Sequence, residues 1–136
     1  MRQVLFVEDD DYVRELFAGA LRDAGITVTE AKLAEHVLDV LKVELPELII
    51  LDLGMPPGEM SGTELLARLR ENPAWAALDL IVFSGMGDVL NPDVVRGLRV
   101  HTVFTKPTTT VHELVRTVQT ILHEHGRARG ERPSPS

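Results

Sequence analysis

Short apolar runs alternate with amphipathic stretches along this chain. Apolar and β-branched residues in continuous runs predict strands at 4–7, 26–29, 48–51, 80–83 and 100–104. Apolar residues at helical spacing predict helices around 13–24, 34–41, 65–69, 94–98 and 114–122. Strands that alternate with helices in this way form a parallel sheet with helices on both faces. The predicted fold class is therefore α/β.

Polar residues mark several of the predicted helix ends. Asp10 or Asp11 is placed to cap the first helix, and Gly25 follows that helix where a left-handed residue is needed. The segments 61–64 and 110–113 each begin with Ser or Thr and end with Glu, which is the spacing of a capping box. These signals place the third and the last helix directly after the two boxes.

The composition excludes several classes of function. The chain has 136 residues, enough for one domain with its own core, and a formal net charge of −7. This acidic excess argues against binding to a nucleic-acid backbone, which depends on clustered Lys and Arg. The chain has no Cys, which excludes a disulfide framework, a thiolate zinc site and a Cys nucleophile. No apolar run approaches the roughly 20 residues of a membrane span, and the N-terminus MRQVLFVEDDD turns acidic too soon for a signal peptide. Together with the missing cysteines, these features lead us to expect a cytoplasmic protein without membrane contact.

The chain is predicted to fold as one domain followed by a tail. Residues 1–125 hold all the predicted strands and helices, whereas 126–136 show no periodicity and contain mainly Arg, Gly, Pro and Ser. We therefore expect this tail to be disordered. His112, His123 and His125 lie on or near the last helix without a carboxylate at metal-binding spacing, and we expect them to face solvent.

The residues that follow the apolar runs carry the candidate chemistry. Glu8 and Asp9 follow the first run, and Asp52 follows the third. Ser84 follows the fourth run, and Lys106 the fifth. Ligands of parallel α/β sheets bind beyond the carboxyl ends of the strands. Carboxylates that converge there repel one another unless a cation lies among them, and oxygen ligands suit Mg²⁺. The pattern predicts a Mg²⁺-dependent phosphoryl site with a carboxylate as candidate nucleophile.

Four of these segments together resemble the receiver domains of two-component response regulators. VLFVEDD is similar to the first strand and acidic pair of that family, and LIILDLGMP to its phosphoacceptor strand. IVFSG resembles the fourth strand with its hydroxyl, and FTKP the fifth strand with its lysine and proline. The resemblance runs from about Val4 to His123. It implies a five-stranded parallel sheet in the flavodoxin-like order 2-1-3-4-5.

The resemblance also implies roles for individual residues at a phosphorylation site. Asp52 would accept a phosphoryl group from a phosphohistidine. Ser84 would then hydrogen-bond a phosphoryl oxygen, and Lys106 would pair with Asp52 or with the added charge.

A Mg²⁺ site beside the phosphoacceptor is implied in the same way. Asp9 would bind Mg²⁺ directly together with Asp52, and Glu8 would contribute through a water molecule. The backbone carbonyl of Gly54 would supply another oxygen. Mg²⁺ is thus the implied cofactor, and it should bind before phosphate does.

The implied function is a switch whose only chemistry is on itself, not an enzyme with a separate substrate. The donor would be a sensor histidine kinase or a phosphotransfer protein. A downstream protein effector would read the face formed by the fourth helix, the fifth strand and the fifth helix. We expect no direct nucleic-acid binding and no membrane binding. A homodimer through the last helices is compatible with the sequence, which does not decide it.

Two features depart from the family pattern. The family usually has an aromatic residue three positions before the lysine, whereas this chain has Val103 there. Phe104 points to the opposite face by strand alternation, which argues against a switch based on rotation of an aromatic ring. The loop PPGEMSG is also longer than the usual pattern, with Pro57 and Glu59 as the insertion.

Two other functions remain open on the sequence. A Mg²⁺-dependent phosphohydrolase would use an aspartyl-phosphate intermediate, but that class typically needs a second carboxylate two residues after the nucleophile, where this chain has Gly54. A pseudo-receiver would never be phosphorylated and would serve as a docking module. This alternative is disfavoured because Asp52, Ser84 and Lys106 are all present.

Overall fold

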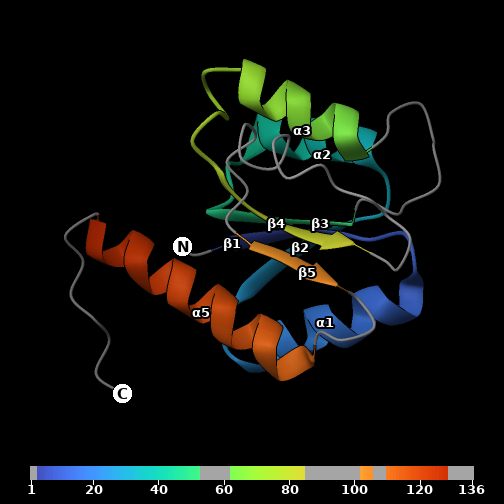
Figure 1. The fold of residues 1–136 in the computed structure, drawn as a ribbon, viewed down its shortest axis with the longest axis vertical. Coiled ribbons are helices and arrows are strands. Elements are labelled where there is room, and N and C mark those ends of the chain that lie inside the picture. The colour runs from blue at the N-terminus through green and yellow to red at the C-terminus, as the bar shows by residue number, and fades with distance from the viewer. Residues whose placement is uncertain (1–2, 53–61, 85–101, 106–109, 129–136) are drawn as a thin grey trace.

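The chain forms a parallel β-sheet between two layers of helices (Figure 1). The computed structural model describes residues 3–52, 62–84, 102–105 and 110–128. The strands are β1 (Gln3–Val7), β2 (Thr27–Ala31), β3 (Leu48–Asp52), β4 (Asp79–Ser84) and β5 (Thr102–Thr105). The helices within these residues are α1 (Asp11–Asp23), α2 (Ala34–Val43), α3 (Gly62–Glu71) and α5 (Val111–Ala128).

The strands pair in parallel in the order β2-β1-β3-β4-β5. In Figure 1, α1 and α5 cover one face of the sheet, and α2 and α3 cover the other. This is the α/β fold with flavodoxin-like topology that the sequence predicts. The helix predicted around 94–98 and the loop with Pro57 and Glu59 lie outside the described residues. Within the described ranges, no helix is both long and apolar enough to cross a membrane.

The central strand β3 is buried on both faces because a layer of helices covers each of them. Leu48 and Ile50 pack into the cluster beneath α1 and α5, whereas Ile49 and Leu51 pack into the cluster beneath α2 and α3. All four side chains are fully buried. A strand with two covered faces has no solvent side for polar residues, which explains the continuous apolar run at 48–51.

The register of the strands brings three strand ends together at one edge of the sheet. Val7 lies opposite Leu51, and Leu51 lies opposite Val82. The residues that follow β1 therefore lie beside the last residue of β3, and the end of β4 comes next. This carboxyl edge is where parallel α/β sheets bind their ligands.

Side-chain caps begin α1 and α5, as predicted. The backbone N–H of Val13 donates to Oδ1 of Asp10 at 3.1 Å, so Asp10 is the cap of α1. The backbone N–H of Glu113 donates to Oγ1 of Thr110 at 3.1 Å. Each bond satisfies a donor that has no partner within its own helix. The capping box predicted at 61–64 lies partly outside the described residues.

The left-handed glycine predicted after the first helix is also present. Gly25 has a φ of 84°, and its N–H donates to the carbonyl of Arg22 at 2.9 Å. The N–H of Ile26 donates to the carbonyl of Leu21 at 3.0 Å. These two bonds form a Schellman motif, which satisfies carbonyls at the end of the helix.

We expect Gly25→Ala and Gly19→Ala to change stability in opposite directions. A Cβ at Gly25 would meet no atom within 4 Å, so its cost comes from the positive φ alone. That cost should lower the free energy of unfolding by about 1–2 kcal/mol. Gly19 lies inside α1, also in open space, and Ala there should raise the free energy of unfolding by about 0.5–1 kcal/mol. Urea unfolding would measure both, and a loss of stability in both variants would contradict this account.

The last helix carries a histidine that is only partly exposed to solvent. Nε2 of His125 contacts Oδ2 of Asp79 at the start of β4, and the His125 side chain is 24% exposed. The prediction that His125 faces solvent therefore holds only in part, because the fold brings α5 against a strand 46 residues away in the sequence. His112 and His123 are exposed, as predicted. The helix itself continues to Ala128, beyond the predicted end of the domain.

Candidate functional site

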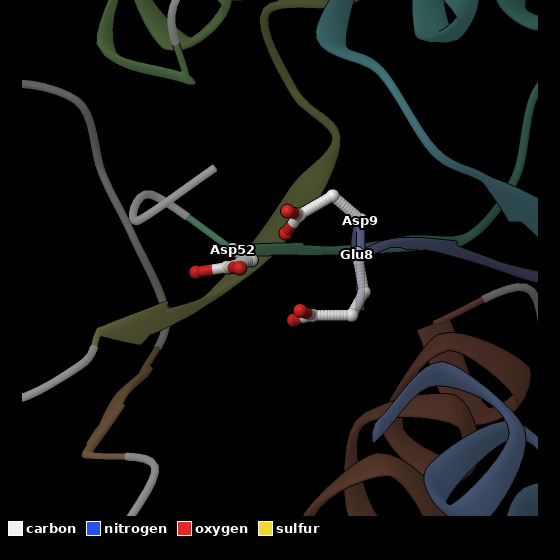
Figure 2. A group of neighbouring side chains, drawn as sticks. All are labelled: Glu8, Asp9 and Asp52. Atoms are coloured by element: carbon white, nitrogen blue, oxygen red, sulfur yellow. The ribbon is translucent and has the colours of Figure 1, made fainter. Parts of the chain in front are cut away.

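Three carboxylates gather at the carboxyl edge of the sheet (Figure 2). Glu8 follows directly after β1, Asp9 comes next, and Asp52 is the last residue of β3. One carboxylate oxygen from each residue lies within 4.8 Å of the other two. Figure 2 shows the side chains of Glu8 and Asp9 extending from the end of β1 toward the side on which Asp52 lies. The structure thus brings together the three acidic residues that the sequence singled out.

Two of these three carboxylates are buried. Glu8 is 0% exposed and Asp52 is 1% exposed, while Asp9 is more exposed. Asp52 is buried because β3 lies between β1 and β4 in the sheet. Ionised carboxylates at such distances repel one another, and burial reduces the screening by water. The cluster therefore concentrates negative charge at the end of an apolar strand.

The donor set of this cluster suits a hard divalent cation. It offers carboxylate oxygens, which are the ligands that Mg²⁺ prefers, whereas zinc sites typically include nitrogen or sulfur. A cation among the three carboxylates would also offset their mutual repulsion. The residues at this edge therefore fit Mg²⁺.

Of the other predicted site residues, the structure describes only the backbone of Ser84. Ser84 is the last residue of β4, and the register pairs its neighbour Phe83 with Asp52. The backbone of Ser84 therefore reaches the same edge as the acidic cluster. The side chain of Ser84, and all of Gly54 and Lys106, lie outside the described residues. Their roles stay predictions.

Three hydrogen bonds hold Glu8 in place. Its N–H donates to the carbonyl of Ala31 in β2 at 3.0 Å, and its own carbonyl accepts from Nη1 of Arg14 at 2.9 Å. The N–H of Asp10 donates to Oε1 of Glu8 at 3.2 Å. The backbone of Glu8, the first residue of the acidic pair Glu8 and Asp9, is therefore hydrogen-bonded to both β2 and α1.

Arg14 is a residue near the site that sequence reasoning missed. It is 6% exposed, its Nε donates to Oε1 of Glu30 at 3.0 Å, and its Nη2 pairs with Oδ1 of Asp11. Hydrogen bonds from Arg14 and then Lys32 hold the pKa of Asp11 below its usual value. The bond to Asp11 in turn raises the pKa of Arg14. One signal was present in the sequence, because Arg14 lies three residues before Phe17 and seven before Leu21, which is the spacing of one helix face.

Comparison with known proteins agrees with this fold. Residues 4–119 match the family model of the response regulator receiver domain. The match covers most of the chain and runs from β1 through the first half of α5. This chain belongs to the response regulator receiver family.

Individual relatives cover the chain to different extents. An uncharacterized 14.6 kDa protein from Leptolyngbya boryana is 35% identical over 116 residues, which are 85% of this chain and 86% of that protein. The phosphate regulon transcriptional regulatory protein PhoB of Pseudomonas aeruginosa is 32% identical over 134 residues, which are 97% of this chain and 56% of PhoB. The chain thus spans about half the length of this transcriptional regulator.

Solved structures show the same fold. A response regulator receiver protein from Pseudomonas putida aligns with a TM-score of 0.78 and 32% identity, covering 88% of this chain and 96% of that one. A receiver domain protein from Methanospirillum hungatei aligns with a TM-score of 0.80 over 94% of this chain and 98% of that one. Its identity is 22%, so this second likeness bears on the fold alone.

Proposed function

We propose that this receiver is a phosphorylation switch in which Asp52 accepts a phosphoryl group from a phosphohistidine. As a member of its family, the chain is a signalling module of two-component systems. The observation that carries the proposal is the acidic cluster. Asp52 ends the central strand in a buried position, and one of its carboxylate oxygens lies within 4.8 Å of those of Glu8 and Asp9.

The proposed transfer needs a carboxylate nucleophile and a way to offset charge. A carboxylate oxygen of Asp52 would form a bond to phosphorus while the bond from phosphorus to the donor imidazole nitrogen breaks, and the imidazole would keep that electron pair. Mg²⁺ bound at the cluster would supply positive charge beside the phosphoryl oxygens. The proposed ligands are Glu8, Asp9, Asp52 and the backbone carbonyl of Gly54.

The proposed switch follows from the added charge on Asp52. A phosphoaspartate brings negative charge and three acceptor oxygens, so it would draw the hydroxyl of Ser84 toward itself and pair with Lys106. Because Val103 stands where the family usually has an aromatic residue, we propose that the Ser84 movement carries the signal. The surface that changes would include the segment between β4 and β5, β5 itself and α5.

The partners we propose are proteins. A sensor histidine kinase or a phosphotransfer protein would donate the phosphoryl group, and a protein effector would read the result. Some relatives are named as transcriptional regulators, but the net charge of −7 supports signalling by this receiver through protein contacts and not through nucleic acid. We also propose a cytoplasmic location and a single receiver followed by a tail. Because α5 continues to Ala128, this tail begins after that residue and not at 126 as the sequence predicted.

Incubation with acetyl phosphate tests the proposed function directly. We expect the intact mass of the protein to increase by one phosphoryl group when Mg²⁺ is present and to stay unchanged in EDTA, since the carboxylates alone repel the incoming phosphate. Peptide mapping should place the group on Asp52. A protein that stays unmodified under conditions where it binds Mg²⁺ would instead be a docking module. Continuous turnover of a generic phosphate ester would indicate a phosphohydrolase.

We expect Mg²⁺ to stabilise the folded protein. At a hundredfold excess over its dissociation constant, Mg²⁺ should raise the free energy of unfolding by about 2.7 kcal/mol, because the unfolded chain does not hold the three carboxylates together. Urea unfolding with and without Mg²⁺ would measure the increase. Asp52→Asn should show a smaller increase than the wild type, since the cluster loses one of its negative charges and holds the cation less tightly. Equal increases in both proteins would mean that the stabilising cation binds elsewhere.

A further inference from the structure

The guanidinium of Arg14 contacts three separate parts of the chain around the acidic pair. It donates to the carbonyl of Glu8, to the carboxylate of Glu30 in β2 and to the carboxylate of Asp11 in the first turn of α1. Arg14 is 6% exposed, so these bonds form largely away from water. A planar guanidinium with five N–H donors in a fixed fork can hold three acceptors at once, which an ammonium group cannot do with the same geometry.

The contact with Glu8 is the one that bears on the candidate site. The Glu8 carbonyl belongs to the peptide group that joins Glu8 to Asp9. A bond from Arg14 to this oxygen restricts rotation of the peptide group, and that rotation would change the directions of both carboxylates. The N–H of Glu8 is bonded to Ala31 in β2, so the residue is held from two sides.

We propose that Arg14 is a positioning residue for the acidic cluster, orienting Glu8 and Asp9 for a divalent cation through its bond to the Glu8 carbonyl. This inference rests on the proposed function, since it assumes that the cluster binds Mg²⁺. Residues that orient metal ligands through hydrogen bonds typically change metal affinity by about 10–100-fold when they are replaced. Arg14 would not bind the cation itself. Its effect on the cation would pass through the peptide group that joins Glu8 to Asp9.

Arg22 offers a matched control on the same helix. It pairs with Oε2 of Glu30 at 3.0 Å and donates to the carbonyl of Val28 at 2.9 Å. Arg22 therefore resembles Arg14 in charge, in its shared partner Glu30 and in binding a backbone carbonyl. The two arginines differ in two respects. The carbonyl partner of Arg22 lies within β2 and not next to the acidic pair, and its side chain is 46% exposed whereas that of Arg14 is 8% exposed. A general loss of positive charge near the site would affect both variants, whereas loss of positioning would affect only the Arg14 variant.

Calorimetric titration of the metal-free protein with MgCl₂ tests the inference. Arg14→Gln should weaken Mg²⁺ binding by about tenfold, whereas Arg22→Gln should stay within about twofold of the wild type. Arg14→Lys keeps the charge but lacks the fork, so it should weaken binding nearly as much as Arg14→Gln. If Arg14→Gln does not fold, Arg14→Lys carries the comparison. Circular dichroism at the titration temperature would establish that each variant is folded.

Amide hydrogen exchange of the metal-free proteins gives a readout that needs no cation. The N–H of Asp10 donates to Oε1 of Glu8, so its exchange reports how firmly Glu8 is held. It should exchange faster in Arg14→Gln and Arg14→Lys than in the wild type, and at the wild-type rate in Arg22→Gln.

The possible results separate this inference from the function on which it rests. The inference alone would be overturned if the wild type binds Mg²⁺ and is phosphorylated, and if folded Arg14→Gln or Arg14→Lys binds Mg²⁺ with the same affinity as the wild type. Equal weakening in the Arg14 and Arg22 variants would do the same. A wild type that binds no Mg²⁺ would overturn the proposed function, and the inference with it.

Discussion

Replacing Asp52 by Asn should abolish phosphorylation of this receiver by acetyl phosphate. The carboxamide is a far poorer nucleophile than the carboxylate, and the substitution also removes one negative charge from the acidic cluster. Loss of a nucleophile typically reduces the rate by several orders of magnitude, so we expect a drop on the order of a thousandfold or more. Intact-mass spectrometry over time, with Mg²⁺ present, would measure the rate of incorporation.

A matched variant makes this result specific to the site. Asp39 lies exposed on α2, and Asp39→Asn removes the same charge without touching the acidic cluster. Its rate of phosphorylation should equal that of the wild type. If Asp52→Asn is modified as fast as Asp39→Asn, another residue is the acceptor and the assignment of Asp52 is wrong.

The largest effect on stability should come from Phe6→Ala. Phe6 is 0% exposed in β1, and its ring centroid lies 6.3 Å from that of Phe17 and 6.2 Å from that of Phe83. Removing the ring would leave a cavity between β1, α1 and β4 that the surrounding backbone cannot close. We expect the free energy of unfolding to fall by about 3–5 kcal/mol. Urea unfolding at equilibrium would measure this loss.

An exposed aromatic residue provides the control for this prediction. Tyr12 in α1 is 75% exposed, so Tyr12→Ala removes a ring of similar size from the surface. Its effect should stay within about 0.5 kcal/mol. A similar loss in both variants would show that the cluster of Phe6, Phe17 and Phe83 does not contribute more than surface packing.

Most of the sheet could be predicted because its strands carry local signals. The apolar run at 48–51 became β3, with its layers of helices on both sides. The second strand was placed less well, since β2 covers Thr27–Ala31 where 26–29 was predicted. Ile26 belongs to the turn that ends α1, where its N–H bonds the carbonyl of Leu21. An apolar residue beside a glycine turn looks the same in sequence whether it packs in a strand or caps a helix.

The proximity of the three carboxylates followed from the sequence and the topology together. Asp52 comes at the end of an apolar run, and a parallel sheet brings neighbouring strand ends to one edge. The register of β1 with β3 then sets Glu8 and Asp9 beside Asp52. The apolar run and the general rule for parallel sheets could be followed without coordinates, whereas the register comes from the structure.

The local pattern of apolar and polar residues determined the fold class, the ends of α1 and the position of the acidic cluster, because burial and capping depend on neighbours within a few residues. The tertiary structure alone decided which basic side chains contact which carboxylates. Arg14 binds Glu30 from 16 residues away, and His125 contacts Asp79 from 46 residues away. Such pairs depend on which segments the fold brings into contact. The spacing of charged residues along the sequence does not indicate which residues they will pair with.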